Sequence, residues 1–268
     1  MLHQITFVGT LSALDITDLG YSALLTITQP RLDKPEESDV MKYELVGQAG
    51  AVASLQAQGI TDGDKVFGVA YQVDHKVAGA RQWLRFQTNM IGLAGIETPD
   101  RLVATLTGNV GRDATMSYSE HNGTAKTFFT MALNNTSANA NGGTDVSTVW
   151  LNINVLGSLK KGNRRAEAAA QKVVRGATIQ VSIYKMALRA YTNAGGNDGV
   201  SIDCLASNFA VVSSPAAKEK AESAVVMDMP SAAARAAAEN AGVTRTLPSV
   251  NGQGQNGAVP VVNIDTGF

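Results

Sequence analysis

Cysteine is almost absent from this sequence, because Cys204 is the only one in 268 residues. No disulfide can form within the chain, which fits a protein of the reducing cytoplasm. The three histidines, His3, His75 and His121, are far apart and have no cysteine partners at the spacing of metal ligands. We therefore expect neither a metal site nor a cofactor.

Long apolar runs are also missing. No segment approaches the roughly 20 consecutive apolar residues that a membrane-spanning helix needs. The first residues, MLHQITFVGT, enter an alternating pattern directly, without the basic start, apolar stretch and small-residue cleavage site of a signal peptide. We expect a cytoplasmic protein that makes no membrane contact.

Catalytic patterns are equally scarce. No Ser-His-Asp or Cys-His arrangement is present, and Asp113, Glu120 and Asp145 lie in turns or loops without a paired carboxylate. The glycine-rich segment 108–113 lacks the Lys-Ser/Thr ending of a phosphate-binding loop and the change from strand to helix that such a loop requires. We predict that the protein is not an enzyme.

Charge is distributed unevenly, although the net charge is only −1. Residues 1–100 carry 7 basic and 12 acidic side chains, whereas residues 101–214 carry 11 basic and 6 acidic ones. A polyanion would therefore bind the middle of the chain in preference to its start.

Alternating apolar residues predict short β-strands in the first hundred residues. Strands are expected over 4–8, 21–27, 41–45, 65–71 and 83–91, with one short helix over 51–58. Five strands with a helix between the third and fourth predict an all-β fold, a small five-stranded barrel.

The second hundred residues repeat this order. Gly9-Thr10-Leu11 is matched by Gly108-Asn109-Val110, and Gly63-Asp64 by Arg175-Gly176 before the next strand. We interpret the chain as two tandem copies of one barrel, residues 1–98 and 99–214, followed by a low-complexity, largely flexible tail, residues 215–268. The alternative is one larger β domain with coincidental spacing.

The strand periodicity of the second copy places aromatic, basic and amide side chains on one outer face. Aromatic side chains beside cations can stack on nucleobases while the cations neutralise phosphates. The alternative is that the tryptophan packs under a loop or at a subunit interface. A slip in the alternation near Lys185 indicates a bulge. The residues predicted on this face are Trp150, Phe128, Tyr191, Lys126, Arg189, Asn152 and Asn154.

A basic loop, KKGNRR over 160–165, follows the Trp150 strand. Its side chains could contact phosphates, although a solvated loop is the simpler alternative. We therefore also predict nucleic-acid contacts at Lys160, Lys161 and Arg164 of this loop, and at Arg112 of the glycine-rich segment.

Residues 104–213 resemble the bacterial single-stranded DNA-binding protein family, whose fold is the OB barrel. The motifs that carry the resemblance are LTGNVGRDATMSY (106–118), NGTAKTFFTMAL (122–133), TVWLNINVLGSL (148–159), EAAAQKVVRGATIQVSI (167–183) and ASNFAVV (206–212). The resemblance implies two tandem OB-folds and single-stranded DNA binding on the nucleoid during replication, recombination and repair. It also implies stacking at Trp150, with Tyr191 near a second stacking position.

The chain departs from the family pattern at several points. Leu156 stands where many members have an aromatic residue before the glycine that follows the third strand. Two domains in one chain are similar to the minority of members with tandem OB-folds, which implies a homodimer with four barrels. The first copy is acidic and matches the motifs poorly, so Trp83, Arg85 and Phe86 are its only evident candidates for DNA contact.

The tail ends in PVVNIDTGF. Family members commonly end in an acidic tip with a terminal phenylalanine that docks partner proteins, so Asp265 and Phe268 imply docking of replication or repair proteins. An unremarkable disordered end is the alternative. A different class also stays open, namely a structural or adaptor protein whose OB-like barrels bind other proteins.

Overall fold

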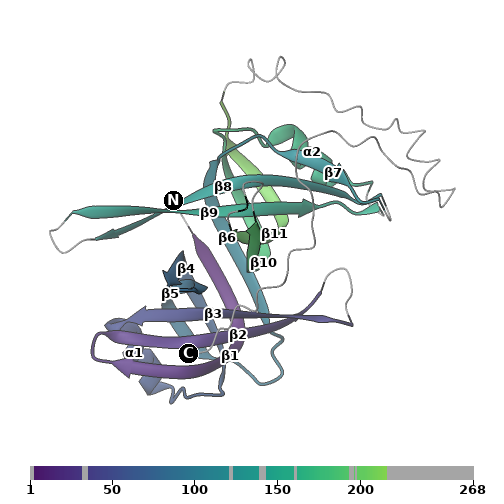
Figure 1. Ribbon diagram of the computed structural model, residues 1–268. Helices are drawn as coiled ribbons and strands as arrows, with labels where there is room; N and C mark the ends of the chain where they lie inside the picture. The colour runs from purple at the N-terminus through teal and green to yellow at the C-terminus, as the bar shows by residue number, and fades with distance from the viewer. Residues whose placement is uncertain are drawn as a thin grey trace.

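A computed structural model describes residues 3–31, 36–120, 123–138, 143–159, 162–192, 196 and 198–215. In this part of the chain two barrels lie one above the other (Figure 1). The first contains β1 (Gln4–Thr17), β2 (Gly20–Pro30), β3 (Ser38–Gln48), α1 (Ala49–Ala57), β4 (Lys65–Ala78) and β5 (Arg81–Leu93).

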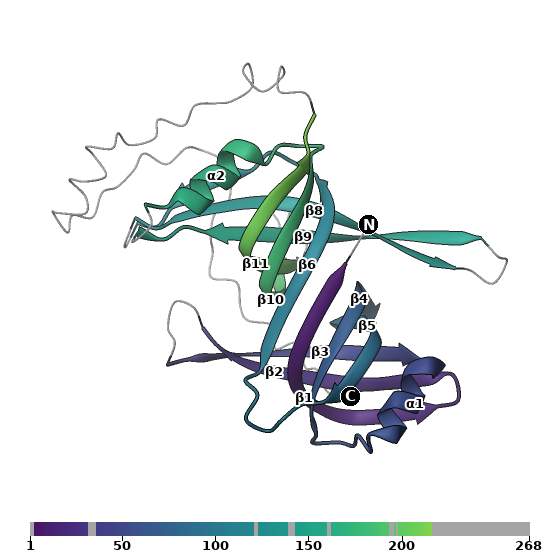
Figure 2. The ribbon, with the colours of Figure 1, turned by 180° about the vertical axis from the view of Figure 1, so that it is seen from behind.

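The second barrel has the same order of elements. It contains β6 (Arg101–Val110), β7 (Thr115–Tyr118), β8 (Ala125–Ala138), β9 (Thr144–Leu156), α2 (Arg164–Lys172), β10 (Thr178–Thr192) and β11 (Asp198–Ser213). The short strand β7 pairs with β8, as the end of β1 pairs with β2 in the first barrel after a register shift between Ser12 and Asp15. The strands extend beyond the predicted ranges, and one helix lies against each barrel (Figure 2).

Each barrel closes through one parallel pair of strands, β3 with β5 and β9 with β11. The other pairings are antiparallel and correspond between the barrels: β1–β2 to β6–β8, β2–β3 to β8–β9, β1–β4 to β6–β10, and β4–β5 to β10–β11. The prediction of two tandem OB-fold barrels is confirmed.

Backbone details show how closely the barrels repeat. Leu11 donates its N–H to Asp64 O at 3.0 Å and accepts from Gly63 N–H at 2.9 Å. Val110 forms the same pair of hydrogen bonds, with Ala177 O at 2.8 Å and Gly176 N–H at 2.9 Å. The equivalence therefore extends to individual hydrogen bonds.

Two glycines allow the first strand of each barrel to pass close to the second. A Cβ at Gly9 would lie 2.5 Å from Thr26 O, and a Cβ at Gly108 would lie 2.5 Å from Ala132 O. Any larger residue would clash with backbone at these crossings, so glycine is required.

The bulge predicted near Lys185 is confirmed, because the β10–β11 register shifts between Ile183 and Lys185. The β4–β5 register shifts at the equivalent place, between Ala70 and Gln72. Both fourth strands therefore bend at the same point along the barrel.

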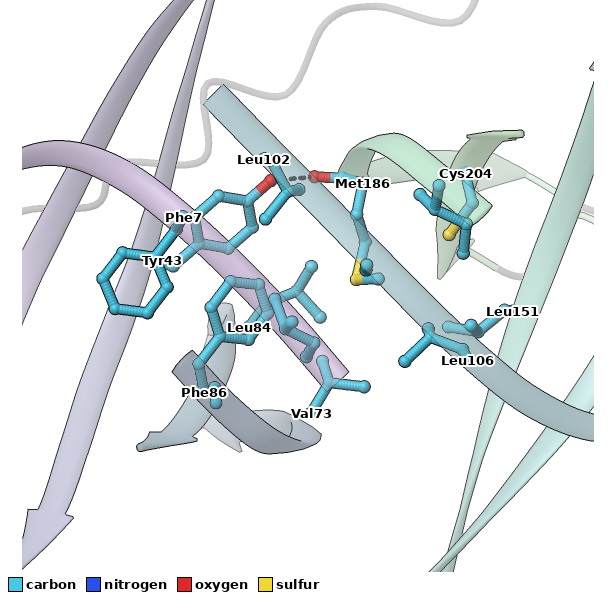
Figure 3. Close-up of a cluster of buried hydrophobic side chains, with 14 of the residues drawn as sticks. Phe7, Tyr43, Val73, Leu84, Phe86, Leu102, Leu106, Leu151, Met186 and Cys204 are labelled. Carbon is cyan, nitrogen blue, oxygen red and sulfur yellow. Dashed lines mark hydrogen bonds between the residues drawn. The ribbon is translucent and has the colours of Figure 1, made fainter. Parts of the chain in front are cut away.

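The barrels are joined by β1 and β6, which pair antiparallel from Gln4–Thr105 to Val8–Arg101. In Figure 2 the two strands run side by side between the barrels. The buried side chains form one cluster that spans both barrels. Within it the Tyr43 hydroxyl donates to Met186 O at 2.6 Å, which links β3 of the first barrel to β10 of the second (Figure 3).

In the part of the chain described here, no helix has the length and apolar character to cross a membrane. Among the same residues no group of three or more His, Cys, Asp or Glu side chains could hold a metal ion. The predicted tail, with Asp265 and Phe268, lies outside the described residues, apart from its first position, as do Lys160 and Lys161.

Candidate nucleic-acid interface

Trp150 is the most exposed aromatic side chain of the second barrel, with 56% of its surface accessible. It lies on β9 opposite Ala132 of β8, whose short side chain leaves the indole uncovered. A Cβ at Gly111 would lie 2.6 Å from the indole ring, so the ring lies directly over this glycine. Gly111 is thus part of the site, and the sequence reasoning did not include it.

Arg112 and Phe128 are brought together on the same part of the surface. The Arg112 guanidinium carbon lies 4.5 Å from the centroid of the Phe128 ring, a cation–π contact. Phe128 is half-buried on β8, and Arg112 is exposed just after β6. The pair places a cation beside an aromatic ring, although sequence alone did not connect the two residues.

Arg189 is held only loosely. Its Nη1 lies 3.5 Å from Asp203 Oδ2, and 63% of its side chain is exposed. The same carboxylate accepts from Asn152 Nδ2 and from Ser201 Oγ, both at 3.0 Å. Asp203 therefore orients Asn152 and leaves most of the guanidinium available to a ligand.

Tyr191 is 43% exposed near the end of β10. It pairs across the sheet with Gly199, where a Cβ would lie 2.7 Å from the phenol ring. The hydroxyl end of the ring therefore packs on the glycine, as the edge of the Trp150 ring packs on Gly111. Both glycines provide room for an aromatic ring on an outer face.

The structure covers Asn154, contrary to the exposed position expected from the strand phase. Only 6% of Asn154 is accessible, and its Nδ2 donates to Cys204 O at 3.3 Å. This buried hydrogen bond links β9 to β11, so the Asn154 side chain stabilises the pairing of these two strands. Cys204 itself is fully buried, and burial raises the pKa of its thiol, so it is a neutral core group.

The remaining cations lie at the edges of the second barrel. Lys126 is exposed on β8 opposite Leu156, and Arg164 is exposed at the first residue of α2. Asn163, which precedes α2, accepts from Ala125 N–H at 3.1 Å and donates to Gly123 O at 3.1 Å. The start of α2 is therefore anchored to the entry of β8.

The strand registers allow the outer faces of the two barrels to be compared residue by residue. Thr26 and Ala132 are equivalent, because the two crossing glycines approach their carbonyl oxygens in the same way. Across the next strand pair Thr26 lies opposite Lys42, and Ala132 lies opposite Trp150. The first barrel therefore has an exposed lysine where the second has its exposed tryptophan.

Two residues further along, Glu44 stands in the position of Asn152. Glu44 is 6% accessible and accepts from Arg85 Nε at 2.6 Å and Arg85 Nη2 at 2.9 Å. The Trp83 indole N–H also donates to Glu44. Trp83 and Arg85 are thus held by a carboxylate, which makes them poor candidates for a surface that must accept DNA.

Residues 103–212 match the model of the single-strand binding protein family. No curated protein sequence matches the chain.

Two solved structures share the fold. A deletion mutant of the single-stranded DNA binding protein from Thermus aquaticus aligns with a TM-score of 0.54 and 15% identity, over 80% of this chain and 96% of that one. The wild-type protein aligns with a TM-score of 0.52 and 16% identity, over 80% and 95%.

Proposed function

We infer that this chain, whose residues 103–212 belong to the single-strand binding protein family, is a tandem OB-fold protein that binds single-stranded DNA. Proteins of this family bind DNA and carry out no catalysis, so the chain is not an enzyme. In this proposal it coats single strands on the nucleoid during replication, recombination and repair.

The exposed indole of Trp150 is the observation that supports the site of binding. An aromatic ring on a wet face accepts any base, because every base has a π-face, and one stacked base contributes about 1–3 kcal/mol. The cation–π contact of Arg112 with Phe128 adds a second ring and a charge nearby. We propose that Trp150, Phe128 and Tyr191 stack on bases while Arg112, Lys126 and Arg189 neutralise phosphates.

The other predicted contacts have smaller parts in this proposal. Asn152 is oriented by Asp203 toward the same face, and Arg164 extends the basic edge at α2. Lys160 and Lys161 would continue that edge, and Asp265 and Phe268 would dock partner proteins. We also propose 1–98 and 99–214 as the domain limits, followed by the 215–268 tail.

A homodimer through the sheet that joins the barrels is the assembly we propose. Met90, Val69, Thr6 and Val103 form one row across β5, β4, β1 and β6, because each pairs with the next. Met90 and Val103 are 46% and 44% exposed, and Phe67 next to this row is 41% exposed. The apolar Met90, Val69 and Val103 of this row, with Phe67 beside them, favour contact with a second copy, which would bring four barrels together.

Titration with oligo-dT tests the proposed function. Binding should quench tryptophan fluorescence at low salt, and the logarithm of affinity should fall linearly with the logarithm of salt concentration as counterions are released. Absence of quenching, or affinity that does not depend on salt, would contradict single-stranded DNA binding. Native mass measurement with and without oligo-dT tests the homodimer.

A second function, protein binding by an adaptor, is favoured by the first barrel alone. Its Trp83 and Arg85 are held by Glu44, so this outer face offers little to DNA. Capture of protein partners by a chain without measurable DNA affinity would support the adaptor function.

A further inference from the structure

A cleft of about 320 Å³ lies between the two barrels. One wall belongs to β4 of the first barrel, and the other to β9 and β11 of the second. The lining residues are Asp74, His75, Lys76, Ser147, Thr148, Val149, Trp150, Val200 and Ile202. The volume is at the lower end for small-molecule sites, and suits one planar ring better than a larger ligand.

The cleft continues the exposed face of the second barrel, because Trp150 belongs to both. Ser201, between the lining residues Val200 and Ile202, pairs with Arg189 of β10. A strand that stacks on Trp150 and passes Arg189 is therefore already at the entrance of the cleft.

A cation from the first barrel lines the opposite wall. Lys76 Nζ lies 3.9 Å from Asp74 Oδ2, at the limit of an ion pair, and 38% of the lysine side chain is exposed. His75 beside it is engaged with Gln82 at 2.9 Å through Nε2. Lys76 is thus the group in this wall that a phosphate could reach.

The negative charge of Asp74 is stabilised without Lys76. This carboxylate is 5% accessible and accepts from Gln72 Nε2 and Gln87 Nε2, both at 2.9 Å, and from Asn135 Nδ2 at 3.2 Å. Three amide donors satisfy its oxygens, so the lysine can turn to a ligand without leaving a buried charge unpaired.

The opposite junction between the barrels carries different groups. There Lys185 of β10 forms an ion pair with Asp39 of β3, with 2.6 Å between Nζ and Oδ2. By the register that aligns Lys42 with Trp150, Ser147 occupies the place of Asp39. The cleft therefore has an uncharged serine at the position where the other junction has the Asp39 carboxylate.

We propose that this cleft binds one nucleotide of the single strand, with the base beside Trp150 and the phosphate at Lys76, so that the strand passes there from the second barrel to the first. This inference rests on the proposed single-stranded DNA binding. It assigns a DNA contact to the first barrel on β4, away from the Trp83 and Glu44 cluster.

Lys76→Gln tests the inference, with Lys172→Gln on the exposed end of α2 as the control for charge. For long oligo-dT, removing one phosphate contact should lower affinity roughly fivefold at about 0.1 M salt and make the salt slope less steep by about 0.7. Because the proposal places one nucleotide against both residues, Lys76→Gln should weaken binding of every oligonucleotide length that Trp150→Ala weakens, whereas Lys172→Gln should not.

Ser147→Asp provides an independent variant, because it restores at the cleft the carboxylate that Asp39 supplies at the other junction. It should weaken binding of long oligo-dT, while the uncharged Ser147→Asn of similar size should not. If wild-type protein binds but Lys76→Gln behaves as Lys172→Gln at all lengths, the cleft assignment is wrong and the function stands. If wild-type protein does not bind oligo-dT, the proposed function fails first.

Discussion

In the first barrel Glu44 holds Arg85 and Trp83 from the neighbouring strand, whereas in the second barrel the equivalent position is Asn152, and Trp150 stands 56% exposed beside it. The strand pairings around these residues are the same in both barrels. The same barrel fold thus carries two different outer faces. In the first barrel the tryptophan and arginine are bound to a carboxylate, whereas in the second barrel Trp150 and most of Arg189 are exposed to solvent. In our proposal, base stacking therefore depends on a few outward positions that the barrel core does not restrict.

The largest expected effect comes from removing the carboxylate of the first barrel. Glu44→Ala leaves the partly exposed Arg85 and the Trp83 indole without their acceptor, and should lower the free energy of unfolding by about 3 kcal/mol. Oligo-dT affinity should not fall, because this face is not the main site. Chemical denaturation measures the first quantity, with Glu97→Ala at an exposed position as control. A loss of DNA affinity in a folded Glu44→Ala protein would contradict the comparison.

Trp150→Ala should have the largest effect on binding. Loss of one stacked base should cost about 2 kcal/mol, or roughly thirtyfold in affinity for oligo-dT. Trp83→Ala should change affinity by less than about threefold, because this indole is bound to Glu44. Equal losses in the two variants, measured by fluorescence anisotropy of labelled oligo-dT, would refute the assignment of the second barrel as the main site.

Gly111→Ala sharpens the comparison by moving the indole instead of removing it. The added Cβ would lie 2.6 Å from the Trp150 ring, and the exposed ring can swing away without disturbing the core. We expect affinity to fall by about 1 kcal/mol, half the effect of losing the ring, with stability nearly unchanged. Gly50→Ala, where the new methyl meets nothing within 4 Å, is the matched control. Unchanged affinity in Gly111→Ala would show that DNA binding does not depend on the position of the Trp150 indole over Gly111.

The smallest effect is expected at the cation–π pair. Arg112→Ala should weaken binding by about 0.5–1 kcal/mol and reduce the salt slope by about 0.7, because it removes one phosphate contact as well as the contact with Phe128. Arg112→Lys keeps the charge, so it should preserve the slope and lose only part of the affinity. A salt slope that is the same in wild type and Arg112→Ala would argue against a phosphate at this residue.

Strand alternation predicted the barrel strands, and the order of these elements with the glycines between them favoured two copies over one larger β domain. Period-two patterns reveal which side chains share a face, and the positions of Gly9 and Gly108 show where first strands cross second strands. The same reasoning placed Trp150 on an outer face, where 56% of it is exposed. It failed for Asn154, because whether an outward residue is covered depends on the neighbouring strands, and its amide is bound to Cys204 O.

Contacts between distant segments had no signal in the sequence. Arg112 reaches Phe128 through a turn whose geometry no periodicity describes, and the Glu44 contacts with Trp83 and Arg85 cross a parallel strand pair. Gly111 and Gly199 could have been suspected from isolated glycines near strand ends, but the rings that lie over them could not be identified.

The amino-acid sequence alone determined the two-barrel organisation, the basic second half and the face that carries Trp150, because these depend on local periodicity and on charge counts. Tertiary structure decided which of the predicted residues are free to bind, since exposure and hydrogen-bond partners arise only when strands far apart in sequence are paired. It also decided that Lys76 of one barrel faces Trp150 of the other across a cleft. That juxtaposition results from the β1–β6 pairing, which sets the two barrels against each other.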